Sequence, residues 1–254
     1  MFPAVLEHAL LVGASGLVAG AVNAVAGGGT LVSFPALLAV GVSPVTANIT
    51  SSVGILAGYA GGSVAYRREL SDQGMRVRAL LPFAVLGSIA GALLLLMTPD
   101  TTFRAVVPYL VLLSCALLAV QPRVARTLAA HRGEATSVPW PARVAIGVGA
   151  VYGSYFGAGL GVLMLAVLGI LIADELQRIN ALKGVLSLLI NVVGVIVFLI
   201  STQVAWRYVS ILAVSSYLGA TVGVTIARRL PPAVMRALVI TLGTVVGVVL
   251  LVRG

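Results

Sequence analysis

The sequence has little charge. Asp, Glu, Lys and Arg make up 9% of its 254 residues, whereas a soluble domain carries about 25%. Sixteen basic and seven acidic side chains cannot cover the water-facing surface of a chain this long. This shortage excludes an ordinary cytosolic enzyme, and the 60% apolar content excludes a disordered protein. We infer that the surface faces lipid, and we predict an all-α integral membrane protein.

Residue patterns that carry enzyme and cofactor chemistry are also missing. The one cysteine, Cys115, lies in an apolar run, which excludes a disulfide framework and a cysteine-based metal site. There is no zinc-protease, Walker or G-x-S-x-G motif, and the run Gly27–Thr30 resembles a phosphate loop without its lysine. None of the seven acids falls in the middle of an apolar segment, so a carboxylate proton relay is unsupported. We therefore expect no enzyme activity, no cofactor and no bound metal.

The charges that are present are mostly positive, with a formal net charge of +9. In a soluble protein this excess would suggest nucleic acid. Here most arginines lie in short gaps between apolar runs, which is how membrane proteins encode their orientation. We therefore expect the lipid bilayer as a partner of this chain, and no nucleic acid.

Long apolar runs make up the rest of the chain, and a membrane-spanning helix needs about 20 such residues. Eight runs are present, at 9–41, 45–66, 79–97, 103–121, 143–173, 180–200, 206–227 and 232–252. Six of them have the length of one crossing. The first and fifth are longer, and glycines interrupt both near the middle: Gly27, Gly28 and Gly29 in one, Gly157, Gly159 and Gly161 in the other. Each long run is either one kinked helix or a hairpin of two shorter helices.

The arginines decide between these two alternatives. They crowd the gaps at 67–78, 122–143 and 228–236, which we expect to be cytoplasmic, whereas 98–102 has none. The sixth and seventh runs form one out-and-back pair between two cytoplasmic gaps. The fifth run must therefore begin and end on the cytoplasmic side, folding back at its glycines. If the first run also folds back, both termini lie outside.

The two halves of the chain share an order of features. Each has a glycine-broken run, a short gap, an asparagine at the start of the next run (Asn48 or Asn180), and three crossings. The first copy begins outside and the second inside, which is the inverted-topology repeat of many secondary transporters. Identity between the halves is low, so coincidence is the alternative. We predict a first repeat at 1–121, a cytoplasmic linker at 122–142 and a second repeat at 143–254, each repeat being a glycine-broken helical hairpin plus three transmembrane helices.

The glycine breaks are candidate binding sites. In hydrocarbon, non-helical backbone is tolerated only inside the protein or beside a water-filled cavity. Glycine permits a positive φ and the close approach of a ligand. Half-helices that begin at a break direct their positive dipole ends toward it, which suits an anion. The alternative is close helix packing, which small residues favour in membranes without any ligand.

Uncharged polar residues accompany both breaks. They are Asn23, Asn48, Thr50, Ser51 and Ser52 in the first half, and Ser154, Asn180, Ser187 and Asn191 in the second. Lys183, the only lysine, lies inside the sixth run, one turn after Asn180. It either contacts an anionic substrate, since intramembrane charges usually line a cavity, or extends to the lipid headgroups. The tyrosines and tryptophans lie mostly near the ends of runs and are interpreted as an interfacial belt.

These motifs resemble those of the sulfite exporter TauE/SafE family. The resemblance is carried by NAVAGGGTLVSFPALL at 23–38 with ANIT at 47–50, and by YGSYFGAGLG at 152–161 with NALK at 180–183 and Asn191. It covers nearly the whole chain in length, repeat and motif order. It implies a permease of the bacterial or archaeal inner (plasma) membrane that moves sulfite or sulfur-containing organic anions. Members of this family differ in substrate, so the resemblance does not assign one.

We therefore expect a secondary transporter for small anions, with sulfite or organosulfonates favoured, that works by alternating access. The candidate substrate-binding residues are Asn23, Gly27, Gly28, Gly29, Asn48, Thr50, Ser51, Ser154, Gly157, Gly159, Gly161, Asn180, Lys183 and Asn191. A non-transporting membrane scaffold and an anion channel are the alternatives. The sequence leaves open the direction of transport, the coupling ion and the oligomeric state. Without a buried acid, the transporter is either a uniporter or uses protons carried by its substrate.

Overall fold

The computed structural model describes residues 2–25, 28–65, 70, 72–130, 138–172, 174–200, 204–227 and 232–253. Within these ranges the chain forms helices and no strand. The ten helices are α1 (Phe2–Val25), α2 (Thr30–Ala39), α3 (Pro44–Ala65), α4 (Gly74–Met97), α5 (Asp100–Ala130), α6 (Trp140–Tyr155), α7 (Leu160–Leu171), α8 (Leu176–Leu199), α9 (Trp206–Ala227) and α10 (Pro232–Arg253).

The two long apolar runs each contain two helices, as predicted for hairpins that fold back at glycines. The first run holds α1 and α2, and the fifth holds α6 and α7. The second helix of each pair is short, with 10 residues in α2 and 12 in α7. At 1.5 Å per residue these helices are about 15 to 18 Å long, roughly half the thickness of a bilayer core. In each hairpin, the helix is therefore interrupted inside the bundle.

Four helices in the described part of the chain are long and apolar enough to cross a membrane. These are parts of α1, α4, α5 and α8, at Val5–Asn23, Gly74–Met97, Asp100–Val124 and Gln177–Leu199. Large apolar side chains are exposed along the outer helices, among them Leu10, Leu86 and Leu238. This is the surface expected of a bundle that faces lipid instead of water.

The segment predicted as a linker begins as helix. α5 continues to Ala130, through Pro122. A proline removes one helical hydrogen bond, but the residues that follow it here are mostly arginine and alanine, which favour helix. Residues 131–137 of the predicted linker lie outside the described residues, and α6 begins at Trp140.

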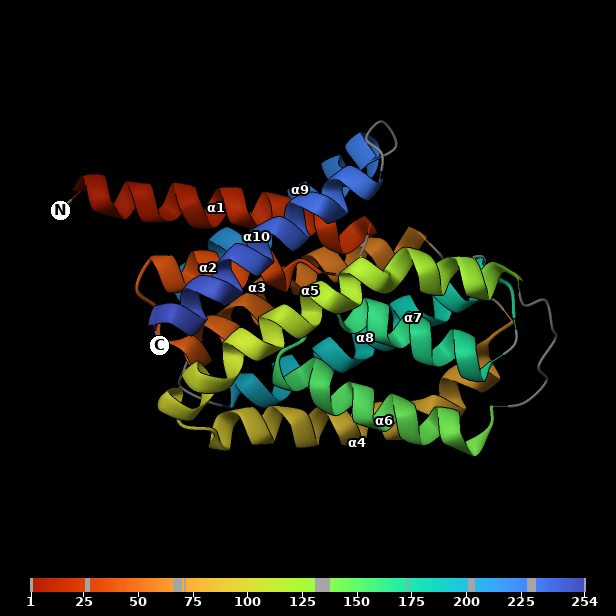
Figure 1. Cartoon of the computed structure of the whole chain (residues 1–254). Coiled ribbons are helices and arrows are strands. Elements are labelled where there is room, and N and C mark those ends of the chain that lie inside the picture. The colour runs from red at the N-terminus through yellow and green to blue at the C-terminus, as the bar shows by residue number, and fades with distance from the viewer. Residues whose placement is uncertain are drawn as a thin grey trace.

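The bundle has two ends, which we name by a residue at each. Figure 1 shows both termini at the end that also carries the α2–α3 and α4–α5 connections, here called the Ser43 end. There the backbone N–H of Val45 donates a hydrogen bond to Asp100 Oδ1 over 2.9 Å. The α5–α6 and α7–α8 connections lie at the opposite end, here called the Asp174 end.

Glycines allow the closest helix contacts in the bundle. A Cβ atom on Gly20 of α1 would lie 2.0 Å from the carbonyl oxygen of Ser216 in α9. A Cβ atom on Gly91 of α4 would lie 2.1 Å from the carbonyl oxygen of Val151 in α6. The helix-packing interpretation of small residues therefore holds for these glycines, which lie outside the two breaks.

The helix contacts also follow a regular pattern. α1 packs on α9 as α6 packs on α4, and α3 packs on α9 as α8 packs on α4. α2 contacts α10 as α7 contacts α5. Exchanging α1–α5 with α6–α10 in order therefore reproduces the main helix pairs, whereas the smaller contacts α1–α10, α3–α5 and α5–α8 have no such equivalent among the described residues.

Candidate functional site between two helix breaks

The first break is held by the amide of Asn23. The backbone N–H of Gly29 donates a hydrogen bond to Asn23 Oδ1 over 2.8 Å, and α2 begins one residue later. Gly29 has an ordinary helical φ of −60°. Glycine is needed there for space, because a Cβ atom would lie 2.5 Å from the carbonyl oxygen of Ala19. Gly28 is buried beside it, and the predicted site residue Gly27 lies outside the described residues.

The second break needs glycine for its backbone conformation. Gly157 and Gly159 have φ values of +78° and +75°, in the left-handed region that side chains other than glycine rarely adopt. The carbonyl of Gly159 accepts hydrogen bonds from the backbone N–H groups of Val162 and Leu163. These bonds begin α7, and Gly161 is buried in its first turn.

The two breaks lie against neighbouring turns of α5. A Cβ atom on Gly28 would lie 3.7 Å from Leu118 Cδ2, and one on Gly159 would lie 3.5 Å from Ser114 Cα. Ser114 and Leu118 are four residues apart, which is about 6 Å along a helix. The hydroxyl of Ser114 also donates to the carbonyl of Ala158 over 2.9 Å. The structure therefore brings together two breaks that are about 130 residues apart in the sequence.

Aromatic rings fill the space between the hairpins. The Phe34 ring of α2 meets the Phe156 ring of the second break edge to face, with centroids 5.6 Å apart. Phe103 of α5 packs on both rings, and all three side chains are at most 1% exposed. Sequence reasoning missed this aromatic cluster, although Phe34 and Phe156 both stand within the glycine-rich motifs.

Asn48 joins the first half of the chain to the second break. Its Nδ2 donates a hydrogen bond to the carbonyl of Tyr155, the last residue of α6, over 2.8 Å. Asn48 is fully buried, and its Oδ1 has no hydrogen-bond partner. At the first break, Asn23 Nδ2 is likewise buried and without a partner. A buried polar atom left unpaired costs about 1–3 kcal/mol, so these two atoms are candidate contacts for a ligand or a water molecule.

The predicted hydroxyl residues mostly hold helices together. Ser51 Oγ lies 2.6 Å from Ser33 Oγ of α2, and Thr50 Oγ1 accepts a hydrogen bond from the backbone N–H of Ala205 over 3.1 Å. Ser154 Oγ lies 2.5 Å from Ser88 Oγ of α4. These hydroxyls already have protein partners, so their clearest effect is to fix α2, α3 and α6 around the breaks.

The predicted residues of α8 form a separate group. Lys183 Nζ donates to Asn180 Oδ1 over 3.2 Å, and Asn191 Nδ2 donates to the carbonyl of Ser187 over 2.8 Å. The hydroxyl of Ser187 is buried without a partner. No hydrogen bond of the described residues joins Lys183 to either break, so the structure does not place it in direct contact with them.

An ion-pair network closes the Asp174 end. Asp174, in the α7–α8 connection, pairs with Arg76 of α4 and, over 2.9 Å, with Arg178 of α8. Arg178 also pairs with Asp72 over 2.6 Å, and Gln73 Nε2 donates to the carbonyl of Arg178. This network ties the α3–α4 connection to the α7–α8 connection. Sequence reasoning found only the charge of this region, because Asp72 and Arg76 lie about 100 residues before their partners Asp174 and Arg178.

The arginines lower the pKa values of both carboxyl groups. Burial opposes ionisation of Asp174, but hydrogen bonds from Arg76 and Arg178 outweigh it and hold its pKa below the usual value. The hydrogen bond from Arg178 is the main cause of the lowered pKa of Asp72. Both acids are therefore ionised at neutral pH, and the network consists of two carboxylates and two guanidinium groups.

Apolar helices arranged around two helix breaks are the architecture of many multi-pass membrane transporters. Comparison with known families agrees with this class and is more specific. Residues 12–250 match the family described as Sulfite exporter TauE/SafE. The chain belongs to this family, which confirms the resemblance found in its motifs.

Curated relatives of the chain are also membrane transporters by name. It is 25% identical over 239 residues to the probable membrane transporter protein YfcA of Escherichia coli strain K12, covering 92% of this chain and 86% of that one. It is 25% identical over 225 residues to a probable membrane transporter protein of Haemophilus influenzae, covering 89% and 87%. The probable membrane transporter protein ORF9 of Sinorhizobium sp is 24% identical over 209 residues, covering 81% and 78%. No solved structure matches the chain significantly.

Proposed function

We propose that this protein is a secondary transporter for small sulfur-containing anions, sulfite or an organosulfonate, and that it works by alternating access. The observation that carries this proposal is the meeting of the two helix breaks on α5, with Asn23 Nδ2 and Asn48 Oδ1 unpaired beside them. Family membership supports transport as the activity. The substrate class is supported by the chemistry of the breaks.

That chemistry favours an anion. α2 and α7 both begin at the breaks, so the positive ends of two helix dipoles are directed toward them. Asn23 Nδ2 adds an unpaired donor, whereas Asn48 Oδ1 adds an unpaired acceptor. An anion that also carries a proton or a hydroxyl group, such as hydrogensulfite or a hydroxysulfonate, has an acceptor suited to Asn23 Nδ2 and a donor suited to Asn48 Oδ1. Such a substrate would bring its own proton, which fits a chain without an acid inside its apolar segments.

The pattern of helix contacts supports an inverted repeat. The main helix pairs are kept when α1 to α5 are exchanged with α6 to α10, as two halves related by a two-fold axis would require. On this proposal the repeats span 1–121 and 143–254, and one rocks against the other around the breaks. The ion pairs of Asp72 and Asp174 join the repeats at one end, so they must separate when that end opens. The arginine-rich gaps make it the cytoplasmic side of a plasma membrane.

The polar residues of α8 fit a role along the path of the substrate between the breaks and the Asp174 end. Lys183 lies one turn after Asn180 in α8, the helix whose first turn holds Arg178 of the ion-pair network. Its ammonium group would attract an anion that arrives from or leaves toward that end. Ser187 offers an unpaired hydroxyl one turn further along.

The test is flux of radiolabelled sulfite into proteoliposomes that hold the purified protein. We expect saturable uptake, which Asn23→Ala and Asn48→Ala each reduce at least about tenfold, as removal of a buried hydrogen bond to a charged group would. Gln177→Ala, an exposed amide on α8, is the matched control and leaves the flux unchanged. Flux that never saturates would identify a channel. No flux of sulfite, taurine, sulfoacetate or thiosulfate would contradict the proposal and favour a scaffold.

A further inference from the structure

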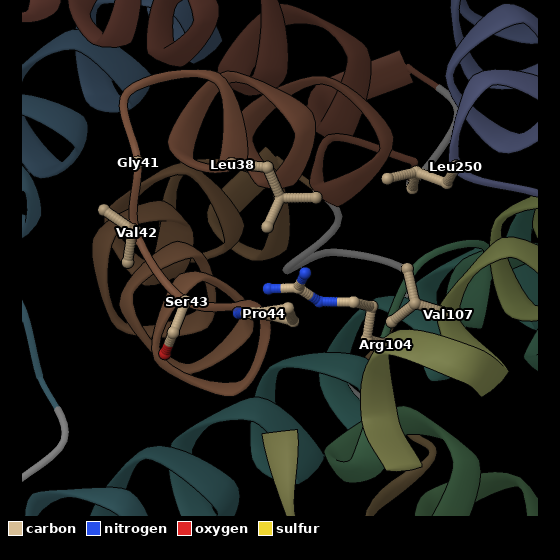
Figure 2. A pocket seen from close by; sticks show the side chains of 8 residues that line it. All are labelled: Leu38, Gly41, Val42, Ser43, Pro44, Arg104, Val107 and Leu250. Atoms are coloured by element: carbon tan, nitrogen blue, oxygen red, sulfur yellow. The ribbon is translucent and has the colours of Figure 1, made fainter. Parts of the chain in front are cut away.

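A pocket outside the two breaks carries a second inference. It lies at the Ser43 end, has a volume of about 400 Å³, and is enclosed by the α2–α3 connection, the start of α5 and the end of α10 (Figure 2). Its walls are largely apolar, formed by Leu38, Val42, Val107 and Leu250. This volume falls within the range of small-molecule sites, about 300–1,000 Å³.

One charged side chain lines the pocket. Figure 2 shows Arg104 reaching from α5 into the space, its guanidinium group between Leu38 and Pro44. The acid one turn earlier, Asp100, does not pair with it; Asp100 Oδ1 accepts the backbone N–H of Val45 instead. No ion pair or hydrogen bond of the described residues involves the Arg104 guanidinium. Its five donors are therefore available to a ligand.

We propose that this pocket binds an anion that has a short apolar body, with its charged head on Arg104. A guanidinium group binds carboxylate, sulfonate or phosphate oxygens through two parallel hydrogen bonds. The Leu38, Val42 and Leu250 side chains offer apolar contact to the rest of the ligand. Ser43 also lines the pocket, but its hydroxyl already donates to Thr46 Oγ1. Inorganic ions such as chloride or sulfate would leave these walls unused, so they bind more weakly.

The pocket lies next to the aromatic cluster of the hairpins. Val107 lines the pocket and also belongs to the buried core that contains Phe34, Phe103 and Phe156. Asn48 bonds to the carbonyl of Tyr155, whose ring packs on Phe103 of the same cluster. None of the residues that line the pocket is among the candidate residues of the breaks, so the pocket is a separate site. A role for this pocket in the entry or exit of substrate rests on the proposed transport function, but the binding of an anion to the pocket does not.

Two sources could supply such an anion, a free organic anion or the headgroup of an anionic lipid. A local probe distinguishes them. We would introduce Ser43→Cys in a Cys115→Ser background and measure the rate at which neutral N-ethylmaleimide modifies the new thiol in nanodiscs. In discs of neutral phosphatidylcholine, butane-1-sulfonate is expected to slow this reaction in a saturable way, whereas butan-1-ol is not.

The guanidinium group is tested by Arg104→Gln, which is expected to raise the protecting concentration of butane-1-sulfonate at least about tenfold. Arg104→Lys keeps part of the protection, and Arg123→Gln, an exposed arginine of α5, keeps all of it. Protection by phosphatidylglycerol discs without added sulfonate, again lost in Arg104→Gln, would identify a lipid headgroup as the source. Equal protection of the thiol at position 43 with Arg104 present and with Arg104→Gln, or no protection by either anion, would overturn the proposal. Asn48→Ala separates the two sites, because it should remove sulfite flux and leave the protection intact.

Discussion

The side-chain amide of Asn48 in α3 donates a hydrogen bond to the carbonyl of Tyr155, the last residue of α6, over 2.8 Å. The bond joins the half of the chain that holds the first break to the backbone of the second break. Because Tyr155 ends its helix, its carbonyl has no helical partner of its own. Asn48 thus caps a helix of the other half and still presents a free Oδ1.

Asn48→Ala is expected to lower the melting temperature of the purified protein, because the buried carbonyl of Tyr155 loses its donor. Such a loss costs about 1–3 kcal/mol. Thermal unfolding in detergent measures it, with Gln177→Ala as an exposed amide control. An unchanged melting temperature in Asn48→Ala would show that the hydrogen bond to Tyr155 does not hold the second break.

Gly159→Ala is expected to destabilise the second break, since its φ of +75° is unfavourable for a residue with a Cβ atom. The cost of that conformation is about 1–2 kcal/mol. Gly184→Ala in α8 is the matched control, because a Cβ atom there meets nothing within 4 Å. Alanine favours helix over glycine, so this control should keep or raise the melting temperature. If both variants behaved alike, the left-handed geometry at Gly159 would be refuted.

Gly91→Ala is expected to disturb the packing of α4 on α6. The added Cβ atom would lie 2.1 Å from the carbonyl oxygen of Val151, so the helices must move apart. Overpacking of this kind costs about 1–3 kcal/mol. Gly74→Ala, at the exposed start of α4 with open space around it, serves as control. Melting curves decide, and equal melting temperatures for the two variants would contradict the close approach of α4 and α6.

The network at the Asp174 end is expected to make stability depend on pH under acid conditions. The folded pKa of Asp174 is below its ordinary value of 3.8, so its contribution is fully present above about pH 4. The contribution is lost as the pH falls further, through the folded pKa, because the unfolded chain binds the proton more tightly. Melting temperature measured from pH 7 to pH 3 should therefore fall at the acid end.

Asp174→Asn tests whether that fall comes from the network. The variant should melt at a lower temperature at neutral pH and show a flatter acid limb, since the pairs with Arg76 and Arg178 are gone. Asp72→Asn should change less, because the Asp72 side chain is 60% exposed and its ion pair is screened by water. A wild-type acid limb retained in Asp174→Asn would assign the pH dependence to other groups.

The sequence predicted most of the architecture because membrane helices are encoded locally. Each apolar run of suitable length contains a helix, and the glycines divided the first and fifth runs into pairs. The end of α5 was not predicted: the arginines after residue 121 were interpreted as a cytoplasmic linker, and the helix continues into this segment through Pro122 to Ala130. The helix propensity of the residues after Pro122 outweighs the hydrogen bond that the proline removes. The length of an apolar run does not reveal this balance.

Taken alone, then, the sequence determined a lipid-facing helical bundle with two glycine breaks and a family resemblance, because apolar run length and glycine position are local properties. Only the tertiary structure decided that the breaks meet on Ser114 and Leu118 of α5. It also decided which polar groups are free. Ser51 and Ser154 are paired with other hydroxyls, whereas Asn23 and Asn48 each keep an unpaired atom. Hydrogen bonds between distant helices depend on how the helices pack, and the spacing of residues along one helix does not determine that packing.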